Sequence, residues 1–317
     1  MKLDSVRALK AELSAEVIAA AGDTPEAYSF YAATPAPMPQ GVALGVAQSV
    51  TATANDEYVL AIRTSDPAAA DAIKARAAGE ANVRLLTVTK RTTPGYFQGT
   101  RRPLEPGLQV GMASKNFVGT LGCFVRDADG TLYALSNSHV LADEGRASPG
   151  HVFGQPFGTS PVGVLARFIP FSTVAPNLVD CALGRLDKTQ ALVGFDAALG
   201  TIPLYGTKRV TADLLGADVW KVGRTTGARK GKVTTVEIDG LPVGYDSGVL
   251  HFNDQLEVSG GPATDFSAAG DSGSLIVLPT GYAIALLFAG GRDSTGEDFT
   301  YGNYLSNVLN ALGVSLA

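Results

Sequence analysis

The chain has 317 residues, of which 45% are hydrophobic and 17% are charged, and its formal net charge is −5. A chain of this length can bury one large core or two smaller ones, which excludes a disordered tail and a small disulfide-stapled protein. Lys and Arg form no cluster, whereas a protein that binds DNA or RNA needs clustered cations to displace counterions from the phosphates. We therefore expect no nucleic-acid partner.

Hydropathy and cysteine content predict where the protein works. Charged residues are spread through residues 1–22, where a signal peptide needs a continuous apolar run, so we expect a cytoplasmic protein. The most apolar later stretch, residues 282–289, is far shorter than the roughly 20 residues that span a bilayer, so no membrane partner is expected.

Cys123 and Cys181 are too few for a disulfide scaffold and lack the spacing of a zinc site. We expect two buried thiols, no metal ion and no cofactor.

The N-terminal part of the chain predicts a helix, a linker and a small α/β unit. Apolar residues at three- and four-residue steps predict an amphipathic helix over residues 3–21, and the prolines of residues 34–41 predict a linker. Two β-branched runs then flank a helical stretch, which is the pattern of a βαβ unit. The expected strands are residues 58–63 and 83–89, and the helix between them is residues 66–78.

The sequence changes in character from about residue 108 onward. Short strand-like runs alternate with turn signals and no helix intervenes, which indicates an antiparallel sandwich or barrel. The 37 glycines of the chain fit many tight turns. A short terminal helix is predicted over residues 304–312. The expected strands are residues 118–125, 132–135, 162–169, 182–186, 219–222, 232–238, 249–252, 255–258, 275–278 and 282–288.

These patterns divide the chain into three parts. Residues 1–40 are the expected N-terminal helix and linker, residues 41–100 a small α/β domain of unknown role, and residues 101–317 a mainly β domain. The α/β domain has no Gly-rich phosphate loop and no metal-ligand spacing, so it offers no chemistry of its own. It is either a regulatory module that binds a partner or a stabilising appendage.

The strongest local signal for chemistry is Ser272, which lies in Gly270-Asp271-Ser272-Gly273-Ser274. A serine between glycines on a tight turn can expose its hydroxyl while nearby backbone N–H groups converge on one point and hold a developing oxyanion. Most Gly/Ser turns are ordinary hairpin turns, so this one indicates catalysis only together with a base and an acid that orients the base.

Three histidines limit the choice of base. His139 follows an apolar strand among small hydroxyl residues, whereas His151 lies in a loop and His251 lies inside a strand-like run. Asp180 opens an otherwise apolar strand, and a buried carboxylate there needs a partner. Three other acidic residues are expected to be solvated: Asp143, Glu144 and Asp187.

The order His139, Asp180, Ser272 in a Gly-rich, many-stranded region resembles the chymotrypsin/trypsin-like serine protease family. The motifs SNSHVL, VDCALG and GDSGS are similar to those that carry the histidine, aspartate and nucleophile of the family. The further motifs GTLGC, GRTTG and LLFAGG resemble bacterial trypsin-like peptidases related to the plant narrow-leaf protease group. The resemblance covers residues 101–317 and implies a mainly β fold with two antiparallel six-stranded β-barrels, preceded by the small α/β N-terminal domain.

The resemblance also implies a function and the residues that perform it. The implied activity is that of a serine endopeptidase acting on protein or peptide substrates, with His139 as general base, Asp180 as its orienting acid and Ser272 as nucleophile. The backbone N–H groups of Gly270 and Ser272 form the implied oxyanion hole. Four residues are implied to contact the substrate: Phe266, Phe288, Ala289 and Gly290.

Other interpretations remain open. Some relatives pair the carboxylate equivalent to Asp271 with a freed N-terminus, and the sequence offers no evident partner for it. The chain could therefore be a latent protease activated by a partner through the N-terminal domain, or a non-catalytic, protease-like binding or scaffold protein. An acyl hydrolase acting on esters is opposed by the triad order, because that class normally uses Ser, Asp, His and a GxSxG elbow.

Overall fold

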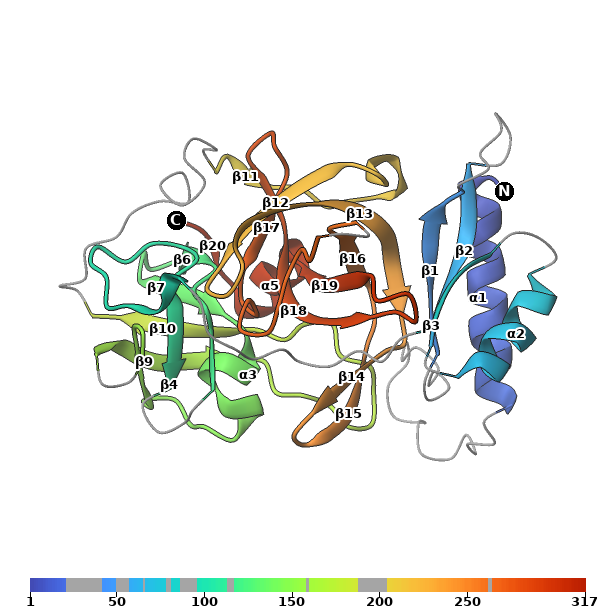
Figure 1. The fold of residues 1–317 in the computed structure, drawn as a ribbon. Helices are drawn as coiled ribbons and strands as arrows, with labels where there is room; N and C mark the ends of the chain where they lie inside the picture. Colours follow the sequence, from blue (N-terminus) through green and yellow to red (C-terminus); the bar gives the residue numbers. More distant parts are fainter. Residues whose placement is uncertain are drawn as a thin grey trace.

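A computed structural model gives the structure of the protein and describes residues 1–20, 42–49, 57–64, 66–77, 81–85, 96–112, 117–157, 160–187, 204–261 and 264–317. Three blocks follow one another along the chain: an N-terminal α/β unit, a curled β-sheet and a closed β-barrel (Figure 1). The linker predicted over residues 34–41 lies outside the described residues.

The curled sheet, drawn mainly in green in Figure 1, has eight strands that are antiparallel to their neighbours. The strand order is β20-β6-β7-β10-β9-β8-β4-β5. The two edge strands, β5 and β20, do not pair with each other, so the sheet is curled but not closed. The strand predicted over residues 118–125 is interrupted at Gly122, where a Cβ would lie 2.3 Å from the carbonyl oxygen of Gly273. The strands are β4 (Gln109–Met112), β5 (Val118–Thr120), β6 (Cys123–Arg126), β7 (Leu132–Ser136), β8 (Val152–Gly154), β9 (Pro161–Phe168), β10 (Ala182–Leu186) and β20 (Ser315–Leu316).

The second sheet contains a barrel of six antiparallel strands. It closes because β12 pairs with both β13 and β17. The hairpin β14–β15 lies between β13 and β16 in the chain, and β11 pairs with β18 in parallel. The strands of this part are β11 (Gly206–Thr207), β12 (Asp218–Gly223), β13 (Gly227–Asp239), β14 (Leu241–Tyr245), β15 (Gly248–Phe252), β16 (Gln255–Ser259), β17 (Leu275–Val277), β18 (Tyr282–Arg292) and β19 (Asp298–Tyr304).

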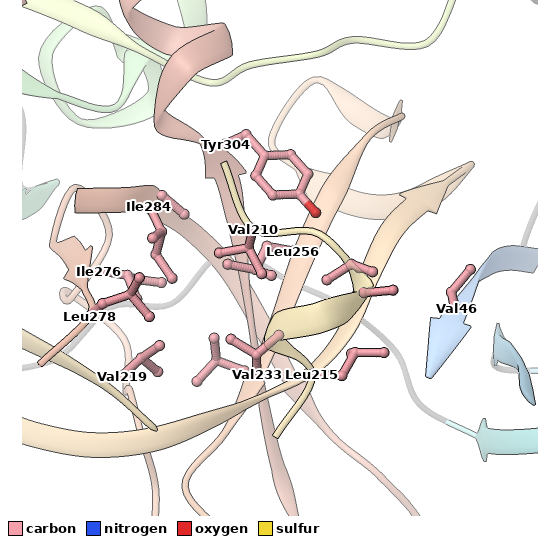
Figure 2. Close-up of a cluster of buried hydrophobic side chains, with 14 of the residues drawn as sticks. Val46, Val210, Leu215, Val219, Val233, Leu256, Ile276, Leu278, Ile284 and Tyr304 are labelled. Atoms are coloured by element: carbon pink, nitrogen blue, oxygen red, sulfur yellow. The ribbon is translucent and has the colours of Figure 1, made fainter. Parts of the chain in front are cut away.

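Alternating apolar residues of the barrel strands fill its interior, as the two-residue period of a strand requires. Figure 2 shows this cluster, in which Val219, Val233 and Leu256 come from three strands of the barrel and Val46 comes from the N-terminal unit. Each fully buried Val or Leu contributes about 1.5–3 kcal/mol to stability relative to an exposed one. The N-terminal unit therefore contributes to the core of the barrel, and a separate cluster that includes Leu44, Leu60 and Ile62 forms its own core.

Helix α5 (Leu305–Leu312) confirms the predicted terminal helix and joins the two sheets. Its buried residues Leu305 and Val308 pack with Leu135 of β7 and with Leu286 of β18. The helix ends at Gly313, whose φ of 62° is left-handed and suits glycine. Three short 3-10 turns complete the description: η2 (Tyr96–Gln98), η3 (Asp143–Gly145) and η4 (Ala212–Leu214).

The N-terminal unit contains the predicted βαβ motif and one strand that the sequence did not predict. β2 (Tyr58–Thr64) and β3 (Ala81–Leu85) are parallel, and α2 (Pro67–Arg76) connects them. Helix α1 (Leu3–Ala20) packs against β1 and β2. The additional strand, β1 (Val42–Gln48), pairs with β2 on one side and with the far end of β13 on the other. The unit thus extends the sheet of the barrel, and the division of the chain at residues 40 and 100 stays a prediction.

Candidate active site

The three residues predicted to form a triad lie where the two sheets face each other. His139 lies on the one-turn helix α3 (Ser138–Leu141), directly after β7. Asp180 lies two residues before β10, which pairs with β7. Ser272 lies in the turn between β16 and β17. All three side chains are buried.

His139 and Asp180 are in direct contact. The Nδ1 atom of His139 lies 2.5 Å from Oδ2 of Asp180. The other carboxylate oxygen, Oδ1, accepts the backbone N–H groups of Ser138 at 2.7 Å and of His139 at 3.2 Å. A carboxylate in this position fixes the tautomer of the imidazole and stabilises its protonated form. Nε2 of His139 has no hydrogen-bond partner among the described residues.

Asp180 has one more partner, which the sequence did not predict. The hydroxyl of Tyr245, at the end of β14, donates to Oδ2 of Asp180 at 2.8 Å. Along β14, Leu241, Val243 and Tyr245 alternate toward the buried side, so the period of the strand predicts that Tyr245 is buried. Its contact with a residue 65 positions away follows only from the tertiary structure.

The turn that carries Ser272 contains two glycines with a positive φ and two amides that are predicted to form an oxyanion hole. Gly270 and Gly273 have φ values of 92° and 94°, which L side chains rarely adopt. Among the described residues, the amides of Gly270 and Ser272 donate no hydrogen bond, whereas the amide of Asp271 donates to Ala268. Two amide donors near the serine hydroxyl are therefore available to an oxyanion.

The Ser272 hydroxyl is not bonded to His139. Its Oγ donates to the carbonyl oxygen of Phe288 at 3.4 Å, a long hydrogen bond. The serine turn and the histidine helix are nevertheless adjacent. A Cβ at Gly119 would lie 2.4 Å from Val140 Cγ2 and 2.7 Å from the carbonyl oxygen of Ser272. A single glycine therefore separates the residue after His139 from the backbone of Ser272.

Asp271 has a buried partner, which the sequence analysis missed. Nζ of Lys221 lies 2.8 Å from Oδ2 of Asp271, and both side chains are fully buried. Burial lowers the pKa of Lys221, although the charge of Asp271 opposes this shift. The sequence signal that could have predicted the burial of Lys221 was the two-residue period of β12, which places Lys221 on the same buried face as Val219.

The four residues predicted to contact the substrate are buried. Phe266 packs in the core of the barrel, where its ring lies against Gly231. Phe288 and Ala289 belong to a separate aromatic cluster. Ala289 and Gly290 pair with β19 after a bulge at Phe288, which leaves the carbonyl of Phe288 facing Ser272. Their role in substrate binding stays a prediction.

The prediction that Asp143 and Glu144 are solvated is wrong, because both are buried in η3. Asp143 pairs with Arg146 at 2.8 Å. Glu144 accepts the amide of Asp246 at 3.1 Å through Oε1 and the amide of Ser247 at 3.3 Å through Oε2. These partners offset the cost of burying the two carboxylates.

Several other expectations can be compared with the described residues. Asp187 and His151 are exposed, and His251 lies on β15. Cys123 and Cys181 are buried and free. No group of metal-ligating side chains occurs in the described part of the chain. Within the same residues, no helix is both long and apolar enough to cross a membrane.

Comparison with known proteins identifies the fold. No protein-family model and no curated protein sequence matches this chain. A glutamic acid specific serine protease of known structure matches 68% of this chain and 100% of its own, with 20% identity and a TM-score of 0.50. Protease A of Thermobifida fusca matches 68% and 99%, with 18% identity and a TM-score of 0.49. A chymotrypsin of Cellulomonas bogoriensis matches 68% and 99%, with 18% identity and a TM-score of 0.47.

The first of these structures settles the fold class and confirms the prediction of a mainly β architecture. The narrower resemblance to peptidases related to the narrow-leaf protease group stays a prediction. The chain has the fold of the chymotrypsin-like serine proteases, with one closed six-stranded barrel and a curled sheet that forms the other half-barrel.

Proposed function

We propose that the protein is a serine endopeptidase that hydrolyses peptide bonds through an acyl-enzyme. One observation carries the proposal: the buried contact between His139 Nδ1 and Asp180 leaves Nε2 of the imidazole without a partner, next to the turn that holds Ser272. This is the arrangement in which an imidazole can accept a proton from a serine hydroxyl.

The proposed reaction begins when Nε2 of His139 takes the proton of Ser272 Oγ while Oγ bonds to the substrate carbonyl carbon. The carbonyl oxygen becomes an oxyanion held by the amides of Gly270 and Ser272, and each such donor is worth about 2.7–4 kcal/mol in related chemistry. His139 then gives the proton to the leaving amine as the C–N bond breaks. Water, activated by the same imidazole, hydrolyses the acyl-enzyme.

The hydrogen bond of the Ser272 hydroxyl bears on one alternative interpretation, that of a latent protease. Because Ser272 Oγ donates to Phe288, the hydroxyl must turn away from this carbonyl before His139 can accept its proton. Catalytic hydrogen bonds are often long without substrate and tighten when it binds. A latent protease, which a partner activates through the N-terminal unit, is the second candidate on this hydrogen bond alone, because Asp271 already has Lys221 as its partner.

The finer features of the function are part of the same proposal. Substrates are proteins or peptides with a small or medium apolar side chain before the scissile bond, contacted by the segment of Phe288, Ala289 and Gly290 and by the region of Phe266. Work in the cytoplasm is supported by two buried, free cysteines, which need no oxidising compartment.

Hydrolysis of fluorescently labelled casein tests the proposal. Ser272→Ala should lower turnover by about 10⁶-fold and leave folding intact. Ser274→Ala is the matched control, because it removes another buried hydroxyl of the same turn that has no partner among the described residues. The control should keep turnover near that of the wild type. Equal turnover in wild type and Ser272→Ala would reject the assignment of the nucleophile.

A further inference from the structure

We propose that Tyr245 is a positioning residue of the active site: its hydroxyl, delivered across the two sheets by the β14–β15 hairpin, sets the orientation of the Asp180 carboxylate toward His139. This inference rests on the proposed function, since it assigns a role within the same triad. It adds a residue and an element that the triad motifs do not contain.

The hydrogen bonds of Asp180 divide between its two oxygens. Oδ1 accepts two backbone amides from the turn that carries His139, and these fix that end of the carboxylate. Oδ2 accepts His139 Nδ1 and the Tyr245 hydroxyl at 2.8 Å. Without the tyrosine, Oδ2 would be held by the imidazole alone, which is the group that it has to orient. The second donor thus fixes the plane of the carboxylate independently of the histidine.

The surroundings of Tyr245 keep its hydroxyl in place. The ring is buried and packs against Phe171, with ring centres 5.0 Å apart, and against Phe252 at 6.0 Å. The centre of the His139 ring lies 6.0 Å from that of Tyr245, in an edge-to-face arrangement. Burial and the nearby charges of Asp180 and Glu144 raise the pKa of Tyr245 well above its usual value. The hydroxyl therefore remains a proton donor to the carboxylate throughout the physiological range.

The tip of the hairpin is held by the turn that follows His139. Both carboxylate oxygens of Glu144 accept backbone amides of the tip, from Asp246 and Ser247. Arg146 reinforces the contact, because its guanidinium lies 3.3 Å from Asp246. The segment that carries the base therefore binds the hairpin that carries the tyrosine, and Glu144 is buried in this contact. The hairpin β14–β15 is labelled in Figure 1.

Tyr245→Phe tests the proposal, since it removes the hydroxyl and keeps the ring contacts. We expect kcat to fall about tenfold with KM unchanged. The acidic limb of the kcat/KM profile should move to higher pH, because a carboxylate that loses a donor stabilises the protonated imidazole more strongly. The charged groups that act on the Tyr245 hydroxyl are the carboxylates of Asp180 and Glu144.

Tyr301→Phe is the matched control. Tyr301 is a buried tyrosine of the same aromatic cluster, and its hydroxyl donates to the carboxylate of Glu257 at 2.9 Å. The control variant should lower the stability of the protein. It should leave kcat and the acidic limb of the kcat/KM profile unchanged. Equal losses of kcat in the two variants, or no loss in Tyr245→Phe, would overturn the proposal.

A second readout separates this proposal from the proposed function. The low-field proton signal of the His139–Asp180 hydrogen bond, recorded by NMR, does not require turnover. A shifted signal in Tyr245→Phe and an unshifted one in Tyr301→Phe would support the positioning role even if the wild type failed to cleave casein. Unshifted signals in both variants would overturn it.

Glu144→Gln, which weakens the hold on the hairpin tip, should shift the signal in the same direction as Tyr245→Phe does. An unshifted signal in Glu144→Gln would overturn the part of the proposal assigned to the hairpin.

Discussion

At the residue scale, the orientation of the Gly270 amide depends on one hydroxyl. Thr225 Oγ1 donates to the carbonyl oxygen of Ala269 at 2.6 Å. The carbonyl and N–H of a trans peptide point in opposite directions, so this bond also fixes where the N–H of Gly270 points. If the Gly270 amide serves the proposed oxyanion hole, the Thr225 hydroxyl is the side chain that orients it.

Replacing this hydroxyl should weaken catalysis without weakening substrate binding. We expect Thr225→Val to lower kcat about tenfold, because the freed peptide no longer holds its donor toward the oxyanion. Thr225→Ser keeps the hydroxyl and should restore most of kcat. Steady-state kinetics on a peptide substrate gives both values. A valine variant as active as the serine variant would show that the peptide is oriented in another way.

The residue types and their order predicted the contact between His139 and Asp180. They did not predict the side chains that support the site. His139 and Asp180 could be paired because their order with Ser272 and the motifs around them resemble the protease family, whereas neither residue is informative alone. Lys221 and Tyr245 could be placed only on buried faces of their strands. Their partners are 50 and 65 positions away in the sequence, and the packing of separate elements brings them together.

At the element scale, strand β19 shows why some of the fold could not be predicted. Its sequence contains Asp298 and Asn303, which are residue types depleted in strands, yet every residue of the strand is buried. The polar side chains have internal partners: Thr300 bonds to Ser267 at 2.6 Å, and Asn303 to Gln255 at 2.7 Å. Strand β1 was missed for another reason, since its apolar residues pair with β13, which lies far along the chain.

The pairing of strand β12 with the nucleophile turn predicts a stability effect. Lys221→Met leaves the Asp271 carboxylate buried without its cation, which should cost about 3–5 kcal/mol of unfolding free energy. Lys232→Met is the control, because Lys232 forms an exposed pair with Asp218 on the same hairpin and should change stability little. Urea unfolding measures both variants. The double variant Lys221→Met/Asp271→Asn should regain part of the loss, and equal stabilities of wild type and Lys221→Met would contradict this account.

At the scale of the whole molecule, a buried ion pair connects the N-terminal unit to the barrel. Arg63 of β2 donates to Glu257 of β16 through Nε at 2.6 Å and through Nη2 at 2.8 Å. Glu257 also accepts the hydroxyls of Thr235 and Tyr301. Burial alone would raise the pKa of Glu257, but Arg63 and the hydroxyl donors lower it overall. The pair therefore links the N-terminal unit to the barrel through a buried contact.

Arg63→Met should destabilise the barrel by about 3–5 kcal/mol at neutral pH. The folded pKa of Glu257 is below its unfolded value in the wild type, so the contribution of the pair is present above about pH 4 and is lost as the pH falls through the folded pKa. The difference between variant and wild type should therefore shrink in acid.

Fluorescence of Trp220, the one tryptophan of the chain, reports barrel unfolding in urea for this comparison. Arg7→Met is the control, because the pair of Arg7 with Glu237 also connects the two parts but is partly exposed. It should change stability little. If Arg63→Met lowers the unfolding free energy no more than Arg7→Met does, the buried pair does not stabilise the contact between the two parts.

Covalent labelling with a fluorophosphonate, followed by intact-mass analysis and peptide mapping, tests directly whether Ser272 is an activated nucleophile. We expect one adduct per chain, on Ser272, and no adduct in the folded His139→Ala variant. No adduct on the folded wild type, or an adduct on another residue, would contradict the claim that Ser272 is a nucleophile activated by His139 and Asp180.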